Sequence, residues 1–546
     1  MIGRSWKHWW FTALFLGSLL ALLFACAPAP TPEPKGAQPA QPATGGAAQA
    51  PAPAPTTAPA AQVVHAPAGK KDLVIVQGTD VQKFDPQMST SDPDIKVSFN
   101  IFDNLLTRGQ DSKLKPALAT EWKQLNDTTV QFKIRQGVKF HNGDPLTAKD
   151  VKFSIDRTAP YGDPTIYTRT VFPTIARVDL VDDYTVNVVT KQPDPLILDR
   201  LAFYGGQIIP MNYVQKVGND GFNAKPIGTG PLKFVEWVKD DHLTLEANKD
   251  WWGGPIAFDK VIFKPMPESA ARVAALLKGE ADIVTKLPPD DVANVNKSAN
   301  AMAVGTPYAG LYVIGSNYKL PFPMNNPQFH QAASLAIDRK SIVDDLWHGL
   351  GQVPNGMYPS VDWCYDPKLP PLEYNPTKAK QLLQQAGYKG EEVIFQSTQG
   401  YLANDKQMAE AIVTMWKDVG INAKLEIIEY SVRAQLQRDK TYKGFYWSDP
   451  TSISLDPDSM IWRLTGPGAS QDYLRVPEID KLMSEAQVTL DQAKRKQLYD
   501  QANQLYMQYM QWTPIIQPVE SYGIQKYVDF TPMSNQDMPI ENIKFK

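Results

Sequence analysis

Residues 114–151 read LKPALATEWKQLNDTTVQFKIRQGVKFHNGDPLTAKDV. Within this stretch, residues 129–134 alternate between outward polar and inward apolar side chains, which predicts a half-buried strand. Thr147 and Asp150 stand three positions apart ahead of Val151, and this spacing resembles the capping box that begins a helix. The stretch therefore predicts a strand followed by a helix, with glycines and prolines at the turns between them.

Other segments also favour a chain of mixed α and β structure. Residues 73–76 and 185–189 are short apolar or alternating runs that predict strands. Asn375 supplies an N-cap and Pro376 a first-turn proline, and Gly387 ends the helix that they begin.

A second unit of this kind lies further along the chain. Residues 408–419 predict an amphipathic helix that Gly420 ends, and residues 421–427 return as a strand. This helix–glycine–strand order favours a βαβ lobe between about residues 310 and 510.

The composition limits the possible functions. The chain has 546 residues, and beyond the first 70 it is long enough for two or more lobes. A net charge of −3 with 21% charged residues gives no electrostatic basis for binding nucleic acid. Aromatic residues make up 10% of the chain, which is compatible with a surface that grips ligands by stacking.

The N-terminal segment predicts export. Arg4 and Lys7 precede the apolar run at residues 9–24, which predicts a signal peptide over residues 1–25. Cys26 follows Ala25 as in a bacterial lipobox, so we expect Cys26 to carry the lipid. The alternative is a transmembrane anchor, but the run is shorter than the roughly 20 residues that a span needs.

Residues 26–70 form the expected link between the lipidated cysteine and the folded part. This segment is dominated by Ala, Pro, Gln, Gly and Thr, a composition that predicts a disordered tether. The chain has two cysteines, and with Cys26 lipidated, Cys364 is left without a disulfide partner. Stability must then come from the core.

The motifs of common catalytic sites are missing from the sequence. It contains no phosphate-binding Gly-x-x-x-x-Gly-Lys-Ser/Thr loop, no His-Glu-x-x-His helix and no Gly-x-Ser-x-Gly elbow. The six histidines are scattered, which disfavours a zinc site. We therefore predict a protein that is not an enzyme and uses no cofactor and no metal.

Spaced motifs along the chain resemble those of one family. They are residues 114–122, 132–151, 226–231 (PIGTGP), 248–254 (NKDWWGG), 332–339 (AASLAIDR) and 374–383 (YNPTKAKQLL). In this order they resemble family 5 of the extracellular solute-binding proteins, the oligopeptide-, dipeptide- and nickel-binding receptors of ABC importers. Their glycines, prolines and caps set turns and helix starts, so they indicate the fold and leave the ligand open.

The resemblance implies an α/β, two-lobed periplasmic-binding-protein fold of type II, three-domain variety, with a hinge and an interlobe ligand cleft. Lobe I would comprise residues 72–103, 207–308 and 513–546, and lobe II residues 309–512. Residues 104–206 would form an inserted subdomain. Strands near residues 308–313 and 513–516 would cross between the lobes as the hinge.

The resemblance also implies a binding site for the ligand's ammonium group. Asp449 is the expected acceptor, with Tyr446 and Trp447 as aromatic walls. Asp456 is a competing candidate, because the spacing in residues 444–458 departs from the family pattern. A turn explains Asp449 equally well, and core packing explains Trp447.

Three more residues align with ligand-contacting regions of such receptors. Asp80 follows the first strand and reaches toward the cleft mouth, unless it is a plain surface turn. Ala309 and Tyr312 lie at the expected lobe crossing, where backbone groups can pair with an extended peptide. The flexibility of a hinge explains the neighbouring Gly310 equally well.

The expected function follows from these implications. The protein would be an extracytoplasmic lipoprotein that captures peptides or peptide-like solutes and delivers them to an ABC permease and its ATPase. We expect a monomer, held on the membrane by its lipid and not bound to nucleic acid. Two alternatives stay open: an oligosaccharide receptor of the same family, and an adaptor that senses peptides without import.

Overall fold

The computed structural model describes residues 64–89, 91–166, 168, 171–452 and 454–546. Residues 62–546 cluster as one compact unit, which is described here by itself. The expectations for the signal peptide and for Cys26 lie outside the described residues, as does most of the expected tether. Within the described part of the chain, no helix combines the length and the apolar character that crossing a bilayer requires.

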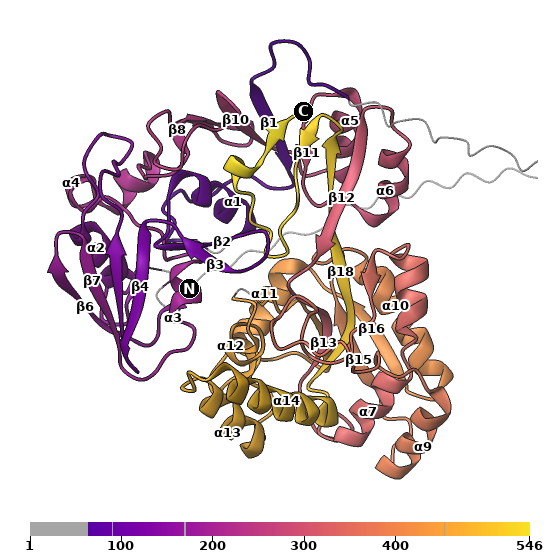
Figure 1. The fold of residues 1–546 in the computed structure, drawn as a ribbon. Helices are drawn as coiled ribbons and strands as arrows, with labels where there is room; N and C mark the ends of the chain where they lie inside the picture. Colours follow the sequence, from indigo (N-terminus) through magenta and orange to yellow (C-terminus); the bar gives the residue numbers. More distant parts are fainter. Residues whose placement is uncertain (1–63, 90, 167, 169–170, 453) are drawn as a thin grey trace, which may run out of the picture. The chain divides into compact units, whose positions relative to one another are not determined.

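A large mixed sheet organises the described residues (Figure 1). Its twelve strands follow the order β16-β15-β17-β13-β18-β11-β1-β10-β9-β8, with β12 and β14 also pairing with β18. These strands are β1 (Asp72–Gln77), β8 (Leu232–Val238), β9 (His242–Ala247), β10 (Lys260–Pro265), β11 (Ile283–Val284), β12 (Ala301–Pro307), β13 (Tyr312–Ser316), β14 (Gly351–Gln352), β15 (Val393–Ser397), β16 (Ala423–Ile427), β17 (Phe445–Ser448) and β18 (Trp512–Gln525).

Strand β18 joins the two halves of this sheet. Its first residues pair with β13, where Trp512 lies opposite Gly315. Its last residues pair with β12, where Gln525 lies opposite Ala301. We call β11-β1-β10-β9-β8 the first sheet half and β16-β15-β17-β13 the second sheet half. The chain thus passes between the halves twice, once along β18 and once between β12 and β13.

The remaining strands of the described residues form smaller sheets. A four-stranded antiparallel sheet has the order β4-β5-β7-β6, and β2-β3 and β19-β20 are two-stranded. Their bounds are β2 (Leu106–Arg108), β3 (Leu114–Pro116), β4 (Ala119–Asn126), β5 (Thr129–Ile134), β6 (Ile175–Asp182), β7 (Thr185–Thr190), β19 (Val528–Asp529) and β20 (Lys544–Phe545). The four-stranded sheet and α2 share one hydrophobic cluster with Val130, Phe132 and Val151 in its interior.

Helices cover the sheets. The α-helices are α1 (Asp92–Ile101), α2 (Ala148–Thr158), α3 (Ile197–Leu201), α4 (Met211–Ala224), α5 (Ser269–Lys278), α6 (Pro289–Asn296), α7 (Pro327–Leu335), α8 (Arg339–Ser341), α9 (Pro376–Ala386), α10 (Asp405–Asp418), α11 (Tyr430–Asp439), α12 (Arg463–Thr465), α13 (Pro477–Ala486) and α14 (Gln492–Tyr509). The bounded helical elements also include two π-helical segments, η2 (Ile342–Leu346) and η3 (Asp458–Trp462), and the 3₁₀ turn η4 (Ile540–Asn542).

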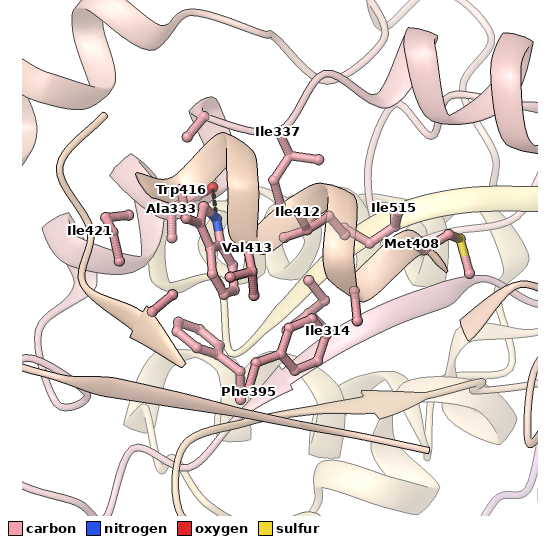
Figure 2. Packing of buried hydrophobic residues seen from close by; sticks show 14 of the residues in the cluster. Ile314, Ala333, Ile337, Phe395, Met408, Ile412, Val413, Trp416, Ile421 and Ile515 are labelled. Carbon is pink, nitrogen blue, oxygen red and sulfur yellow. Dashed lines mark hydrogen bonds between the residues drawn. The ribbon is translucent and has the colours of Figure 1, made fainter. Parts of the chain in front are cut away.

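The core of the second sheet half forms around α10 (Figure 2). Trp416 lies between α7 and β15: its indole N–H donates to the carbonyl of Ala333 at 2.9 Å, and its ring centroid is 5.7 Å from that of Phe395. Burial of such aromatic side chains is a major source of stability. The rigid layer that results positions the loops at the ends of β15 and β17.

The structure confirms the mixed α/β prediction and most of the local ones. Strand β5 has the predicted bounds, and Asn375 and Gly387 cap α9 at its two ends. The capping box is present, since the Asp150 carboxylate accepts the backbone N–H of Thr147 at 3.0 Å. Helix α10 begins at Asp405, three residues before the predicted start, because the Asp405 carboxylate binds the backbone of the preceding loop.

Candidate functional site

A cavity of about 1020 Å³ collects residues from both sheet halves. The second half contributes residues 399–407 and Asp449, and β18 contributes residues 518–521. Opposite them lie residues 286–289 and the start of α1. The volume is in the range of cavities that hold a small organic ligand.

Asp449 lies at the wall of this cavity and directly follows β17. Tyr401 lies in the loop after β15, and its O–H donates to Asp449 Oδ1. Strands β15 and β17 are parallel neighbours, so the residues that follow them emerge at the same sheet edge. Burial raises the pKa of Asp449, against the lowering effects of the Tyr401 hydroxyl and the more distant Arg433.

The carboxylate of Asp405 fixes the loop that carries Tyr401 through several hydrogen bonds. Asp405, at the first turn of α10, accepts backbone N–H groups of Gly400 and Tyr401, each at 3.0 Å, and of Leu402 at 3.3 Å. It also accepts the hydroxyl of Thr398 at 2.7 Å. Several donors on one buried acid make the loop conformation specific. The backbone of the loop that carries Tyr401 is thus fixed by the protein itself.

Aromatic side chains form one wall. The ring centroids of Tyr308 and Tyr312 are 6.4 Å apart, and Tyr312 meets Trp347 edge to face at 5.7 Å. The hydroxyl of Tyr308 shares a hydrogen bond of 2.6 Å with the hydroxyl of Thr451. Burial raises the pKa of both tyrosines, so they are neutral groups that exclude water from the region of Asp449.

Charged groups face Asp449 from other elements. Lys286 forms an ion pair of 3.3 Å with Asp92, which also pairs with Lys96. Burial acts to raise the pKa of Asp92, but the two lysines outweigh it and lower this pKa to about 2. Glu520 on β18 differs from Asp92: burial raises its pKa, and its Oε1 is buried without a hydrogen-bond partner among the described residues.

Two of the expected site residues lie elsewhere. Trp447 points into the core of the second sheet half, where its indole N–H donates to Ser397 Oγ at 3.0 Å. Tyr446 points to the opposite face of β17 and stacks on Tyr442 with ring centroids 4.1 Å apart. Neither side chain lines the cavity, because both faces of β17 are covered by protein. Tyr308, Tyr312 and Trp347 are aromatic residues that do line the cavity.

Asp456 also lies away from the cavity lining. Its carboxylate accepts Arg495 Nη2 at 2.7 Å, the Tyr499 hydroxyl at 2.8 Å and the Trp363 indole N–H at 3.0 Å. The side chain is 1% exposed. Its partners are all from the protein, which is typical of a structural acid.

Of the three other residues expected to contact the ligand, one lines the cavity and two form hydrogen bonds within the protein. Tyr312 lines the cavity, whereas Asp80 accepts Trp237 Nε1 at 3.1 Å and the backbone N–H of Asp240 at 2.8 Å. Ala309 lies at the crossing between the sheet halves, and its backbone pairs with Ser534 at 3.0 Å and with Ser452 at 2.6 Å. Both hydrogen-bonding groups of Ala309 are therefore occupied by the protein and are not free to pair with a peptide.

Sequence reasoning missed Tyr401, Lys286 and Glu520. A signal existed for Tyr401, since the predicted βαβ unit places the loop before α10 at the carboxyl end of a parallel strand. Lys286 adopts the left-handed backbone conformation, with φ of 52°, in a turn that no local residue pattern marks. The sequence around Glu520 shows only a polar residue in a strand. The pairing of β18 is needed to place this residue beside the cavity.

Comparison with known proteins identifies the family. Residues 113–472 match the middle region of bacterial extracellular solute-binding proteins, family 5. The chain belongs to this family. It is 30% identical over 471 residues to di/tripeptide-binding protein 1 of Pseudomonas aeruginosa, covering 79% of this chain and 86% of that protein. It is 26% identical to heme-binding protein A of Haemophilus influenzae, covering 83% and 86% of the two chains.

Solved structures agree with this family assignment. The oligopeptide-binding protein AppA of Bacillus subtilis, in complex with a nonapeptide, superposes with a TM-score of 0.74 at 25% identity, covering 87% of this chain and 99% of that one. The periplasmic-binding-protein fold expected from the sequence is thereby confirmed. The relatives are binding proteins, and their names differ in the ligand, so the family alone does not identify what this cavity holds.

Proposed function

We propose that this protein captures short peptides in the cavity beside Asp449, with the peptide's α-ammonium bound to the Asp449 carboxylate. The observation that carries the proposal is the partner set of this acid. Asp449 lies at the cavity wall, and the hydrogen bond to its carboxylate comes from one tyrosine hydroxyl, so it retains acceptor capacity toward the cavity. The di/tripeptide-binding relative supports a peptide as the ligand.

Physical chemistry favours an ammonium at this position. Burial disfavours the ionised carboxylate, and an approaching cation offsets that penalty while forming a charge-assisted hydrogen bond. Such a bond contributes about 1.5–3 kcal/mol. Tyr308 and Tyr312 exclude water from its surroundings and so strengthen the attraction.

Closure of two lobes would enclose the ligand. We assign lobe I to residues 72–103, 207–308 and 513–546, the inserted subdomain to residues 104–206 and lobe II to residues 309–512. The double crossing, along β18 and between β12 and β13, supports a hinge at this boundary. A ligand that contacts both lobes shifts the equilibrium toward the closed form, which the permease can distinguish from the open one.

The remaining parts of the proposal concern location and partners. The protein acts outside the cytoplasm as a monomer, held on the membrane by lipid on Cys26 and joined to the folded part by residues 27–70. Its partner is an ABC permease with its ATPase, which receives the peptide. The family to which the chain belongs supports an extracytoplasmic place of action.

Native mass spectrometry of the full chain, purified in detergent without refolding, tests the ligand class. We expect adducts whose masses correspond to several short peptides, and calorimetric binding of trialanine. A ladder of adducts at hexose spacing, with binding of maltotriose and none of trialanine, would overturn the peptide assignment in favour of an oligosaccharide receptor.

A further inference from the structure

A second cavity, of about 600 Å³, lies apart from the site beside Asp449. It is lined by the end of α1, the β2–β3 hairpin, the loop at residues 251–253 and the C-terminal segment at residues 533–542. No residue is shared between its lining and that of the first cavity. Its volume is also in the range of small-molecule sites.

Three of the four carboxylates that line this cavity form no ion pair with any described residue. The two cations of the lining already have ion-pair partners: Arg108 pairs with Asp199, and Lys115 pairs with Asp111 of the same lining at 3.4 Å. Asp111 also belongs to the lining, in an ion pair with Lys115, whereas within the described part of the chain the other three lining carboxylates form none. These carboxylates belong to Asp103, Asp537 and Glu541.

Acceptor atoms remain free on this wall. Asp103 accepts the Trp252 indole N–H and the Thr229 hydroxyl, each at 2.8 Å, but both bonds use the same oxygen, Oδ2. Asp537 accepts Asn535 Nδ2 at 2.6 Å through Oδ2, and its Oδ1 is buried without a partner. Burial raises the pKa of both Asp537 and Glu541 to about 7, and for Asp537 it outweighs the lowering effect of Lys96 and Arg108.

Asn104 adds an independent observation from a neutral residue. The side chain is 4% exposed and belongs to the cavity lining. Its Nδ2 donates to the carbonyls of Leu201 at 3.1 Å and of Phe203 at 2.8 Å, which turns the amide oxygen away from that loop. This oxygen, Oδ1, is buried and has no hydrogen-bond partner among the residues that the structure describes. Buried acceptors are normally satisfied, so this one calls for a donor that the protein does not supply.

The aromatic residues of the same cavity favour an organic cation. Trp251 and Trp252 pack with ring centroids 5.5 Å apart, and Phe99 also belongs to the lining. The guanidinium of Arg135 already lies 4.4 Å from the Trp252 ring centroid. Tryptophan faces attract cations, and their apolar surface accommodates the methylene groups of an alkylammonium.

We propose that this cavity is a second binding site, which takes an organic amine whose ammonium groups bind Asp537, Glu541 and the Asn104 oxygen. Its methylene chain would lie against the tryptophans. Both a free polyamine and a lysine side chain present this chemistry. The inference is independent of the peptide site, because the two cavities use different residues.

Calorimetry on the full chain in detergent tests the proposal, with spermidine as the free polyamine and acetyl-lysine-amide as the lysine side chain. We expect one spermidine to bind, and the double variant Asp537→Asn/Glu541→Gln to lower its affinity at least tenfold. The matched control is Asp111→Asn, in the same lining but already paired with Lys115, which should change affinity less than twofold. Tighter binding of the blocked lysine would identify a lysine side chain as the source.

Competition keeps the test independent of how the variants fold. Wild-type protein saturated with trialanine should still bind spermidine with unchanged affinity. The proposal is overturned if spermidine does not bind at all, if trialanine displaces it, or if Asp449→Asn weakens it as much as the double variant. Failure of trialanine to bind would instead count against the peptide site alone.

Discussion

Asp449 and Asp456 are seven positions apart in the chain, yet they differ in their surroundings. The carboxylate of Asp456 accepts hydrogen bonds from four donors of the protein, including the guanidinium of Arg495 and the backbone N–H of Asp458. The carboxylate of Asp449 accepts the hydroxyl of Tyr401 and otherwise faces a cavity. An acid whose charge is balanced inside the protein holds the fold, and an acid whose charge is not balanced is available to a ligand. The two sites can therefore be separated by measuring stability and affinity side by side.

Substitution of Asp456 should have the largest effect. Asp456→Asn leaves Arg495 buried without its counter-charge, and we expect the free energy of unfolding to fall by about 3–5 kcal/mol. Denaturant unfolding measures this change. The affinity of the folded fraction for trialanine should be unchanged, and a loss of affinity without a loss of stability would assign the ligand contact to Asp456.

Asp449→Asn should show the reverse pattern. Loss of the ammonium partner should weaken trialanine binding by about 1.5–3 kcal/mol, or about 10- to 150-fold. The free energy of unfolding should change by less than about 1 kcal/mol, since Asp449 forms no ion pair with any described residue. Calorimetry with parallel unfolding curves checks both numbers, and unchanged affinity would remove Asp449 from the site.

Tyr401→Phe should have a smaller effect on the same site. The substitution removes a hydroxyl that donates to Asp449, and we expect affinity for trialanine to fall by about 0.5–1.5 kcal/mol. Because this hydrogen bond also lowers the pKa of Asp449, the variant should lose affinity at a higher pH than wild type does. An affinity equal to that of wild type across this pH range would show that the hydroxyl does not support the carboxylate.

The pH dependence of wild-type binding should be the most modest effect. Burial raises the pKa of Asp449, and a peptide ammonium prefers its ionised form. Affinity should therefore be full above the raised pKa and decline as the pH falls through it, at a pH higher than that of an ordinary aspartate. Titration calorimetry from neutral pH down to the lowest pH at which the protein stays folded measures the decline, which should be absent in Asp449→Asn.

Local patterns in the sequence predicted the elements well. Strand β5 and the caps of α9 depend on neighbouring residues, so the pattern of a few positions is sufficient. The spaced motifs also predicted the family, because turns and caps recur wherever the fold recurs. Asp449 and Tyr312 were predicted from the resemblance, and both line the cavity.

The rest of the site depends on contacts that the sequence does not display. Tyr401 and Asp449 are 48 positions apart, and they meet because β15 and β17 are parallel neighbours. Tyr446 and Trp447 look like ligand walls in the sequence, but alternation along β17 places them on two covered faces. Whether an aromatic residue faces a cavity or a core is decided by what packs on each face of the sheet, and that requires the tertiary structure.

The most direct test of the central claim is a double-mutant cycle between the ligand's amine and Asp449. Calorimetry would compare trialanine with N-acetyl-trialanine, on wild type and on Asp449→Asn. We predict that wild type prefers the free amine by at least tenfold and that the variant prefers it by less than twofold. An equal preference in both proteins would contradict the account, because the ammonium would then be bound by a group other than Asp449.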